Sequence, residues 1–219
     1  MDPNYWHARW NEGRIGFNQA DGNPLLQKHW EMLDLPAGSR VFVPLAGKSP
    51  DLQWLAARGH RVLAVELSPL AVEQFFAERG LQPAVTTSRY GKHHRAGDIE
   101  MICGDVFELD AEALADCSAV YDRAALIALP APLRQHYLDE VYAALPTGCR
   151  GLLVSLEYPQ TQKEGPPFSV EQTEVEALFG RDWDIEVLER LDILASQAGL
   201  LAEGITSLHT VAYRFQRDR

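Results

Sequence analysis

Three charged side chains, Glu66, Asp105 and Arg123, each stand at or just after an apolar stretch of the chain. A carboxylate in that position can accept hydrogen bonds from both ribose hydroxyls, and a guanidinium can bind a carboxylate. Glu66 follows Gly47 by 19 residues, a separation typical of an acidic residue that binds ribose. We therefore predict a small nucleoside-type ligand. Two alternatives stay open: Glu66 as a solvent-exposed carboxylate at a strand end, and a purely structural ion pair between Arg123 and Asp122.

The turn Gly47-Lys48-Ser49 differs from two common phosphate-binding sites. A P-loop needs a glycine five residues before Gly47, where this chain has Phe42. A dinucleotide fingerprint needs three spaced glycines, and here only Gly47 is present. What remains is a tight turn with one glycine that permits close backbone approach. NAD and FAD are therefore disfavoured, and the ligand need not carry phosphate.

Apolar runs alternate with helical patterns and predict an α/β fold. Seven strands are expected, joined by crossover helices into a mostly parallel sheet with helices on both faces. Ligands of such sheets bind beyond the carboxyl ends of the strands, which is where the charged residues stand. The expected strands cover 40–45, 61–66, 99–103, 119–122, 151–156, 185–191 and 208–215.

Capping and stop signals locate the helices and the polar loops. Residues 1–38 contain Trp6, Trp10, Phe17 and Trp30, and we expect them to form a cap over the ligand edge of the sheet. The pair His93-His94 is expected in a polar surface loop, not in a metal site. Helices are expected between Ser49 and Gly59, between Ser68 and Gly80, over 132–145 and over 169–180, the last with a capping box of Ser169 and Gln172.

Composition excludes several classes of function. The chain has 219 residues, a net charge of −11 and 46% hydrophobic residues, which fits one domain covering 1–219. The negative charge disfavours nucleic acid and anionic membrane surfaces as partners. No apolar stretch is long enough for a membrane span and no secretion signal is evident, so a cytoplasmic location is expected. The three cysteines are far apart, so neither a disulfide framework nor a metal site is predicted.

At several separated motifs the sequence resembles the thiopurine S-methyltransferases, which use S-adenosylmethionine on a class I (Rossmann-like) methyltransferase fold. The resemblance extends over about residues 6–215, and the turn with a single glycine is a feature of that family. The matching motifs are Trp6-x-x-x-Trp10, Gly16-Phe17, the stretch 44–55, Glu66-Leu67-Ser68, Gly104-Asp105, Tyr121-Asp122-Arg123 and the stretch 164–169.

The resemblance implies roles for individual residues. It places Phe17 and Asn18 at the methyl-acceptor pocket, although the family usually has His at the position of Asn18 and Cys at that of Ala46. The arginine that vertebrate members place near the thiopurine late in the chain has no match in 195–199. Residues implied to bind S-adenosylmethionine are Trp10, Leu45, Glu66, Asp105, Val106 and Arg123, of which Asp105 and Val106 lie near the adenine.

The implied reaction is an in-line displacement at the methyl group, which depends mainly on positioning. A thiolate is a strong nucleophile, so we expect no dedicated catalytic base. The substrate would be a thiopurine or another small aromatic thiol, and the enzyme is expected to be a monomer. Some bacterial members of such families also methylate selenium or tellurium species. A methyltransferase for another small nucleophile, such as iodide, and a nucleoside-binding protein without turnover remain as alternatives.

Overall fold

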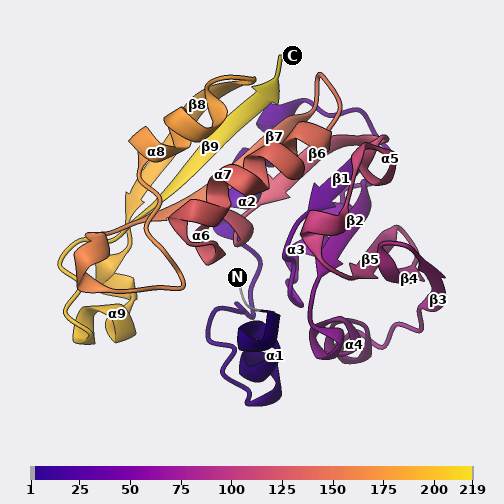
Figure 1. Cartoon of the computed structure of the whole chain (residues 1–219), viewed down its shortest axis with the longest axis horizontal. Helices are drawn as coiled ribbons and strands as arrows, with labels where there is room; N and C mark the ends of the chain where they lie inside the picture. The colour runs from indigo at the N-terminus through magenta and orange to yellow at the C-terminus, as the bar shows by residue number, and fades with distance from the viewer. Residues whose placement is uncertain (1–2, 219) are drawn as a thin grey trace.

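A nine-stranded sheet forms the centre of the fold in the computed structural model, which describes residues 3–218 (Figure 1). The strand order is β3-β4-β5-β2-β1-β6-β7-β9-β8. The five central strands, from β5 to β7, run parallel, and the two strands at each side are antiparallel to their neighbours. The strands are β1 (Arg40–Val43), β2 (Arg61–Glu66), β3 (Ala84–Ser88), β4 (Gly91–Ala96), β5 (Ile99–Cys103), β6 (Cys117–Asp122), β7 (Arg150–Glu157), β8 (Trp183–Asp192) and β9 (His209–Arg217).

Helices pack against both faces of the sheet, as predicted. Alternate residues of β1 point to opposite faces of the sheet. Phe42 packs in the core between the sheet and helices α5 to α8, and Val41 packs in the core between the sheet and helices α2 to α4. The predicted α/β fold is therefore confirmed. The helices are α1 (Pro3–Asn11), α2 (Pro24–His29), α3 (Asp51–Ala57), α4 (Pro69–Glu78), α5 (Ala111–Leu114), α6 (Ala125–Ala128), α7 (Ala131–Glu140), α8 (Gln172–Phe179) and α9 (Ala198–Ala202), with single 3₁₀ turns η1 (Trp30–Leu33), η2 (Val106–Glu108), η3 (Tyr142–Ala144), η4 (Gln160–Gln162) and η5 (Leu194–Ser196).

The predicted count of seven strands is wrong by one hairpin. All seven predicted strands are present, but β3 and β4 form an additional antiparallel pair at one side of the sheet. His93 and His94, predicted in a loop, lie in β4. Every residue of β3 is exposed, and β4 pairs its polar side chains with charged neighbours, so neither strand carries the apolar pattern on which the prediction depended.

Some of the predicted helix boundaries are confirmed and others are wrong. Ser68 caps α4 as predicted, because its hydroxyl accepts a hydrogen bond from Ala71 N at 3.4 Å. The capping box at Ser169 is wrong: α8 begins at Gln172, and the Ser169 hydroxyl accepts from Tyr158 N at 3.0 Å. Ser169 therefore holds the connection after β7 in place. The helix predicted over 132–145 is interrupted after α7 and continues as η3.

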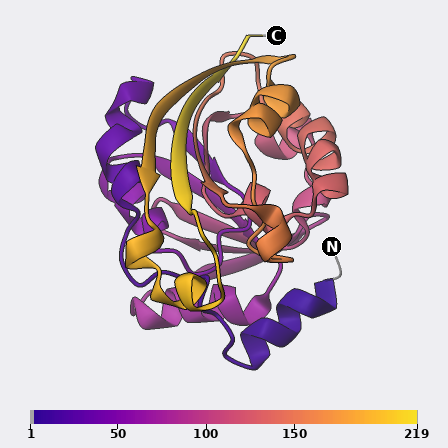
Figure 2. The ribbon, with the colours of Figure 1, turned by 90° about the vertical axis from the view of Figure 1, so that its left-hand side faces the viewer.

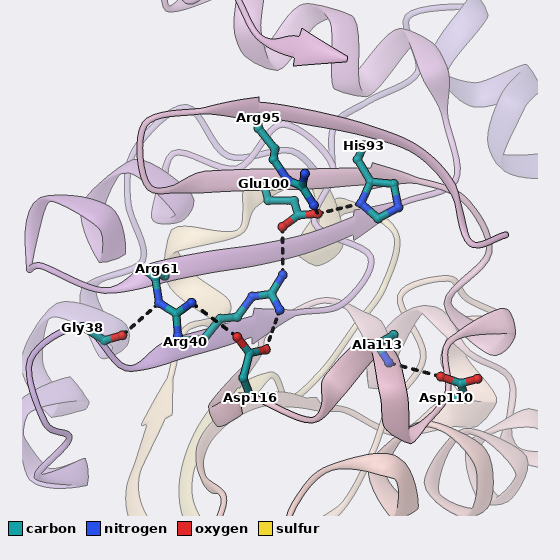
Figure 3. A network of polar contacts seen from close by, with 9 residues as sticks. All are labelled: Gly38, Arg40, Arg61, His93, Arg95, Glu100, Asp110, Ala113 and Asp116. Atoms are coloured by element: carbon teal, nitrogen blue, oxygen red, sulfur yellow. Dashed lines mark hydrogen bonds and ion pairs between the residues drawn. The ribbon is translucent and has the colours of Figure 1, made fainter. Parts of the chain in front are cut away.

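Ion pairs connect the strands at the end of the sheet where the parallel strands begin, which we call the amino edge (Figure 3). Arg40, at the start of β1, contacts Asp116 at 2.5 Å and Glu100 at 2.8 Å. Glu100 also accepts hydrogen bonds from Arg95 at 2.7 Å and from His93 at 2.6 Å when that ring nitrogen is protonated. These contacts connect β4, β5, β1 and the residue before β6. The opposite end, where the parallel strands finish, is called the carboxyl edge and carries the predicted site residues.

Candidate functional site

The turn after β1 is closely packed and strained. Leu45 has a φ of +47°, a left-handed conformation that costs about 1–2 kcal/mol for a residue with a side chain. Ala46 N and Gly47 N donate to the end of β2, to Val65 O at 2.9 Å and to the Glu66 carboxylate at 2.8 Å. A β-carbon on Gly47, whose φ is +55°, would stand 3.4 Å from the Trp10 ring. The positive φ favours glycine at this position, and a β-carbon there would only come into ordinary van der Waals contact with Trp10.

Glu66 ends β2 as a buried carboxylate, so the alternative of a solvent-exposed strand end is wrong. Its side chain accepts hydrogen bonds from Gly47 N and from Ser68 N, both at 2.8 Å. Burial raises the pKa of Glu66, and the two backbone N–H donors oppose that rise. Each carboxylate oxygen keeps a lone pair beyond these bonds, so the pair can accept two further donors side by side. A vicinal diol offers donors with that spacing.

Asp105 and Val106 follow β5, the neighbour of β2 in the sheet. Gly104 N donates to Glu66 O at 3.0 Å, which places the start of this segment beside the end of β2. The Asp105 carboxylate accepts from Phe107 N at 3.0 Å and begins η2. Val106 is buried, and the Phe107 ring stacks on His136 at 5.0 Å. The segment presents one carboxylate beside an apolar surface.

Arg123 follows β6, on the other side of β1. Its Nη1 donates to Asp51 at 3.1 Å, so the alternative of a pair with Asp122 is wrong. Asp122 is fully buried and accepts from the hydroxyls of Tyr137 at 2.9 Å and Tyr142 at 3.0 Å. Burial raises the pKa of Asp122, while these hydroxyls favour its charged form. A guanidinium has five N–H donors, and the bond to Asp51 leaves others for a ligand.

Asp51, the first residue of α3, is a candidate that the sequence analysis missed. Its side chain is 1% exposed and accepts hydrogen bonds from Asn23 N at 2.8 Å, Tyr121 Oη at 3.0 Å and Arg123. Its position in the first turn of a helix gives an ordinary reason for a carboxylate, and its partners lie 28 to 72 residues away in sequence. The only available signal was its position in the matched stretch 44–55.

The N-terminal segment lies at the end of the molecule toward which the parallel strands run (Figures 1 and 2). Trp10 of α1 is 3% exposed, and its ring meets the Phe17 ring edge to face at 5.7 Å. Phe17 is 37% exposed. A β-carbon on Gly47 would stand 3.8 Å from Asn18 Oδ1. Arg9, also missed from the sequence, places its guanidinium 5.9 Å from the Phe17 ring centre.

The structure thus places all eight predicted site residues at one edge of the sheet. Trp10, Asn18 and Glu66 surround Gly47, and Phe17 packs against Trp10. The other predicted residues, Leu45, Asp105, Val106 and Arg123, stand where neighbouring strands end.

Comparison with known proteins identifies the family. The family model described as thiopurine S-methyltransferase (TPMT) matches residues 1–218. The chain belongs to the thiopurine S-methyltransferase family. A thiopurine S-methyltransferase of Xanthomonas campestris pv. campestris (strain 8004) is 61% identical over 218 residues, covering 100% of both chains. One from Nitrosomonas eutropha is 57% identical over 217 residues, covering 99% of each.

Solved structures confirm the class I methyltransferase fold of this family member. A Burkholderia thailandensis 1,6-didemethyltoxoflavin-N1-methyltransferase, with bound 1,6-didemethyltoxoflavin and S-adenosylhomocysteine, matches with a TM-score of 0.65 and 18% identity, over 99% of this chain and 87% of that one. The N-methyltransferase NodS of Bradyrhizobium japonicum WM9, in complex with S-adenosylhomocysteine, matches with a TM-score of 0.62 and 13% identity, over 95% and 97%. At these identities the likeness concerns the fold alone.

Proposed function

We propose that this protein transfers a methyl group from S-adenosylmethionine to the sulfur of a thiopurine or of another small heteroaromatic or aromatic thiol. The observation that carries the proposal is the match to the family over residues 1–218, with relatives at 61% identity over their full length. The site at the carboxyl edge is consistent with it, because it offers acceptors for a diol, an apolar surface and a guanidinium.

The residues at this edge fit the methyl donor. Glu66 would accept hydrogen bonds from the two ribose hydroxyls with the lone pairs that its backbone contacts leave. Arg123 would hold the carboxylate of the amino-acid portion with the donors that Asp51 does not use. Asp105 and Val106 border the adenine, and the strained Leu45 shapes the turn on which the donor rests. When bound, S-adenosylmethionine supplies a methyl group on a positively charged sulfur.

The N-terminal segment places the acceptor and excludes water. Phe17 would stack on the acceptor ring with Asn18 beside it, and the Trp10 ring would stabilise positive charge on the donor sulfur. An in-line displacement by a thiolate needs alignment more than a proton acceptor, so no residue is assigned as a base. Residues 1–38 act as the cap of the site; 1 and 2 lie outside the described residues.

Two consecutive measurements test this function. S-adenosylhomocysteine is titrated into the protein by calorimetry, and methyl transfer from S-adenosylmethionine to 6-mercaptopurine is then followed in the same buffer. Saturable binding with formation of the methylated purine is the expected result. Binding without turnover would contradict the acceptor assignment. Absence of binding would contradict the assignment of the methyl donor itself.

The proposal extends to the form in which the protein acts, a monomeric single domain in the cytoplasm. Within residues 3–218 no helix is long and apolar enough to cross a membrane. The three cysteines are free, and burial raises the pKa of the Cys117 thiol to about 12, which keeps it protonated. Sedimentation equilibrium over a range of concentrations tests the monomer: a mass of 24.5 kDa at every concentration is expected.

A further inference from the structure

One buried carboxylate joins three segments that are distant in sequence. Asp51 accepts hydrogen bonds from Arg123 after β6, from Tyr121 within β6 and from the backbone of Asn23 just before α2. Burial raises the pKa of Tyr121 well above its ordinary value, with the Asp51 charge acting in the same direction, so this hydroxyl stays protonated and donates. Oδ1 contacts Asn23, and Oδ2 contacts the other two donors.

Asp51 is the group that orients Arg123. An arginine side chain is long and flexible, and a charged partner is needed to hold it in one direction. The adjacent carboxylate, Asp122, cannot replace Asp51, because it is buried and already accepts from two tyrosine hydroxyls and two backbone N–H groups. Buried ion pairs contribute little net stability, so a specific orientation is the better explanation for keeping this one.

The same carboxylate also fixes the point where the N-terminal segment joins the sheet. Asn23 precedes α2, and the chain before it carries Trp10 and Phe17. The contact is closely packed: a β-carbon on Gly22 would stand 2.9 Å from Gln27 Nε2 and 3.4 Å from Asp51 Oδ1. Arg123 and the base of the N-terminal segment are therefore connected through the two oxygens of one side chain.

We propose that Asp51 is a positioning residue for methyl-donor binding, which holds Arg123 toward the donor carboxylate and anchors the segment that carries Trp10 and Phe17. The inference rests on the proposed function. It assigns Asp51 no contact with the donor, because the action passes through Arg123 on one side and Asn23 on the other.

A double-mutant cycle with S-adenosylhomocysteine binding as the readout tests the first half. Asp51→Asn keeps a carbonyl oxygen that can accept from Asn23 N. It places an NH2 group, which cannot accept a hydrogen bond, toward Arg123. We expect the dissociation constant to rise about tenfold in Asp51→Asn, and Asp51→Asn combined with Arg123→Ala to bind within about twofold of Arg123→Ala alone. Unchanged affinity in Asp51→Asn, or effects that multiply in the double variant, would overturn the proposal.

A matched control separates orientation from general stability. Glu100→Gln removes another largely buried carboxylate paired with arginines, but at the opposite edge, and should leave the dissociation constant unchanged. If Asp51→Asn fails to fold, Arg123→Ala tests the second half. Because Asp51 then loses a donor, amide exchange over 22–26 should become faster, and unchanged exchange would contradict the link. Failure of the proposed function differs from either result, because the unaltered protein would then not bind S-adenosylhomocysteine.

Discussion

The two edges of the sheet surround a buried carboxylate with different partners and shift its pKa in opposite directions. At the amino edge, Glu100 is surrounded by Arg40, Arg95 and His93. At the carboxyl edge, Glu66 contacts backbone N–H groups, and within residues 3–218 no lysine or arginine forms an ion pair with it. Burial opposes ionisation of Glu100, but its partners outweigh burial and lower the pKa, whereas burial dominates at Glu66 and raises the pKa.

These directions have opposite consequences for stability. The lowered pKa of Glu100 stabilises the fold at pH values above the pKa of the unfolded chain, and this contribution is lost as the pH falls through the folded-state pKa. The raised pKa of Glu66 stabilises the fold only below the unfolded-state pKa and is lost as the pH rises through the folded-state value. The charge of Glu100 therefore supports the fold, whereas ionisation of Glu66 opposes it.

The largest expected effect separates Glu66 from Glu100. In Glu66→Gln we expect the affinity for S-adenosylhomocysteine to fall by about 10- to 100-fold, because a charged acceptor facing the ribose is lost. Glu100→Gln, measured by the same calorimetry, should bind as the unaltered protein does. Equal losses in the two variants would mean that the carboxyl edge has no special part in binding.

The acceptor side should respond differently from the donor side. Phe17→Ala removes the exposed ring that we assign to acceptor stacking, so turnover of 6-mercaptopurine should fall about tenfold. The dissociation constant for S-adenosylhomocysteine should change much less. Steady-state kinetics and calorimetry on the same preparation give both values. A parallel loss in both would show that Phe17 does not distinguish acceptor from donor.

The third expected effect concerns the amino edge alone. Glu100→Gln should lower the free energy of unfolding at pH 7 by about 1–3 kcal/mol, because Arg40 loses one of its charged partners. Urea unfolding followed by circular dichroism measures this difference. The difference should shrink as the pH falls below the ordinary range of glutamate, where the native carboxylate also becomes protonated. A difference independent of pH would show that the charge of Glu100 is not its cause.

The sequence predicted those features that depend on local pattern. The central strands carry continuous apolar runs, and the positions of Glu66, Asp105 and Arg123 at or after strand ends follow from them. The hairpin β3-β4 could not be predicted, because its partners are charges on other strands and not an apolar face. The partner of Arg123 could not be predicted either, since Asp51 lies 72 residues away while Asp122 is adjacent. The binding roles of all the site residues remain predictions, and those of Trp10, Phe17 and Asn18 come from the resemblance alone.

Protonation of Glu66 should change the affinity for S-adenosylhomocysteine. If the ribose hydroxyls donate to the ionised carboxylate, affinity for S-adenosylhomocysteine should weaken as the pH falls through the raised pKa of Glu66. Calorimetry at successively lower pH values, over the range in which the protein stays folded, should show this trend in the unaltered protein and a flatter dependence in Glu66→Gln. An identical dependence in the two proteins would assign the titration to another group.

The smallest expected effect is a change in the dynamics of the N-terminal segment. Phe17 is 37% exposed although its ring packs against two tryptophans, Trp6 and Trp10. A cap that closes on the ligand should exchange its amide protons more slowly when S-adenosylhomocysteine is bound. We therefore expect slower exchange over 3–35, with the amino edge around Arg40 and Glu100 unaffected, because its ion pairs are complete without ligand. Equal exchange over 3–35 with and without ligand would mean that the segment is a fixed part of the fold, and the contrast between the two edges would then be one of charge alone.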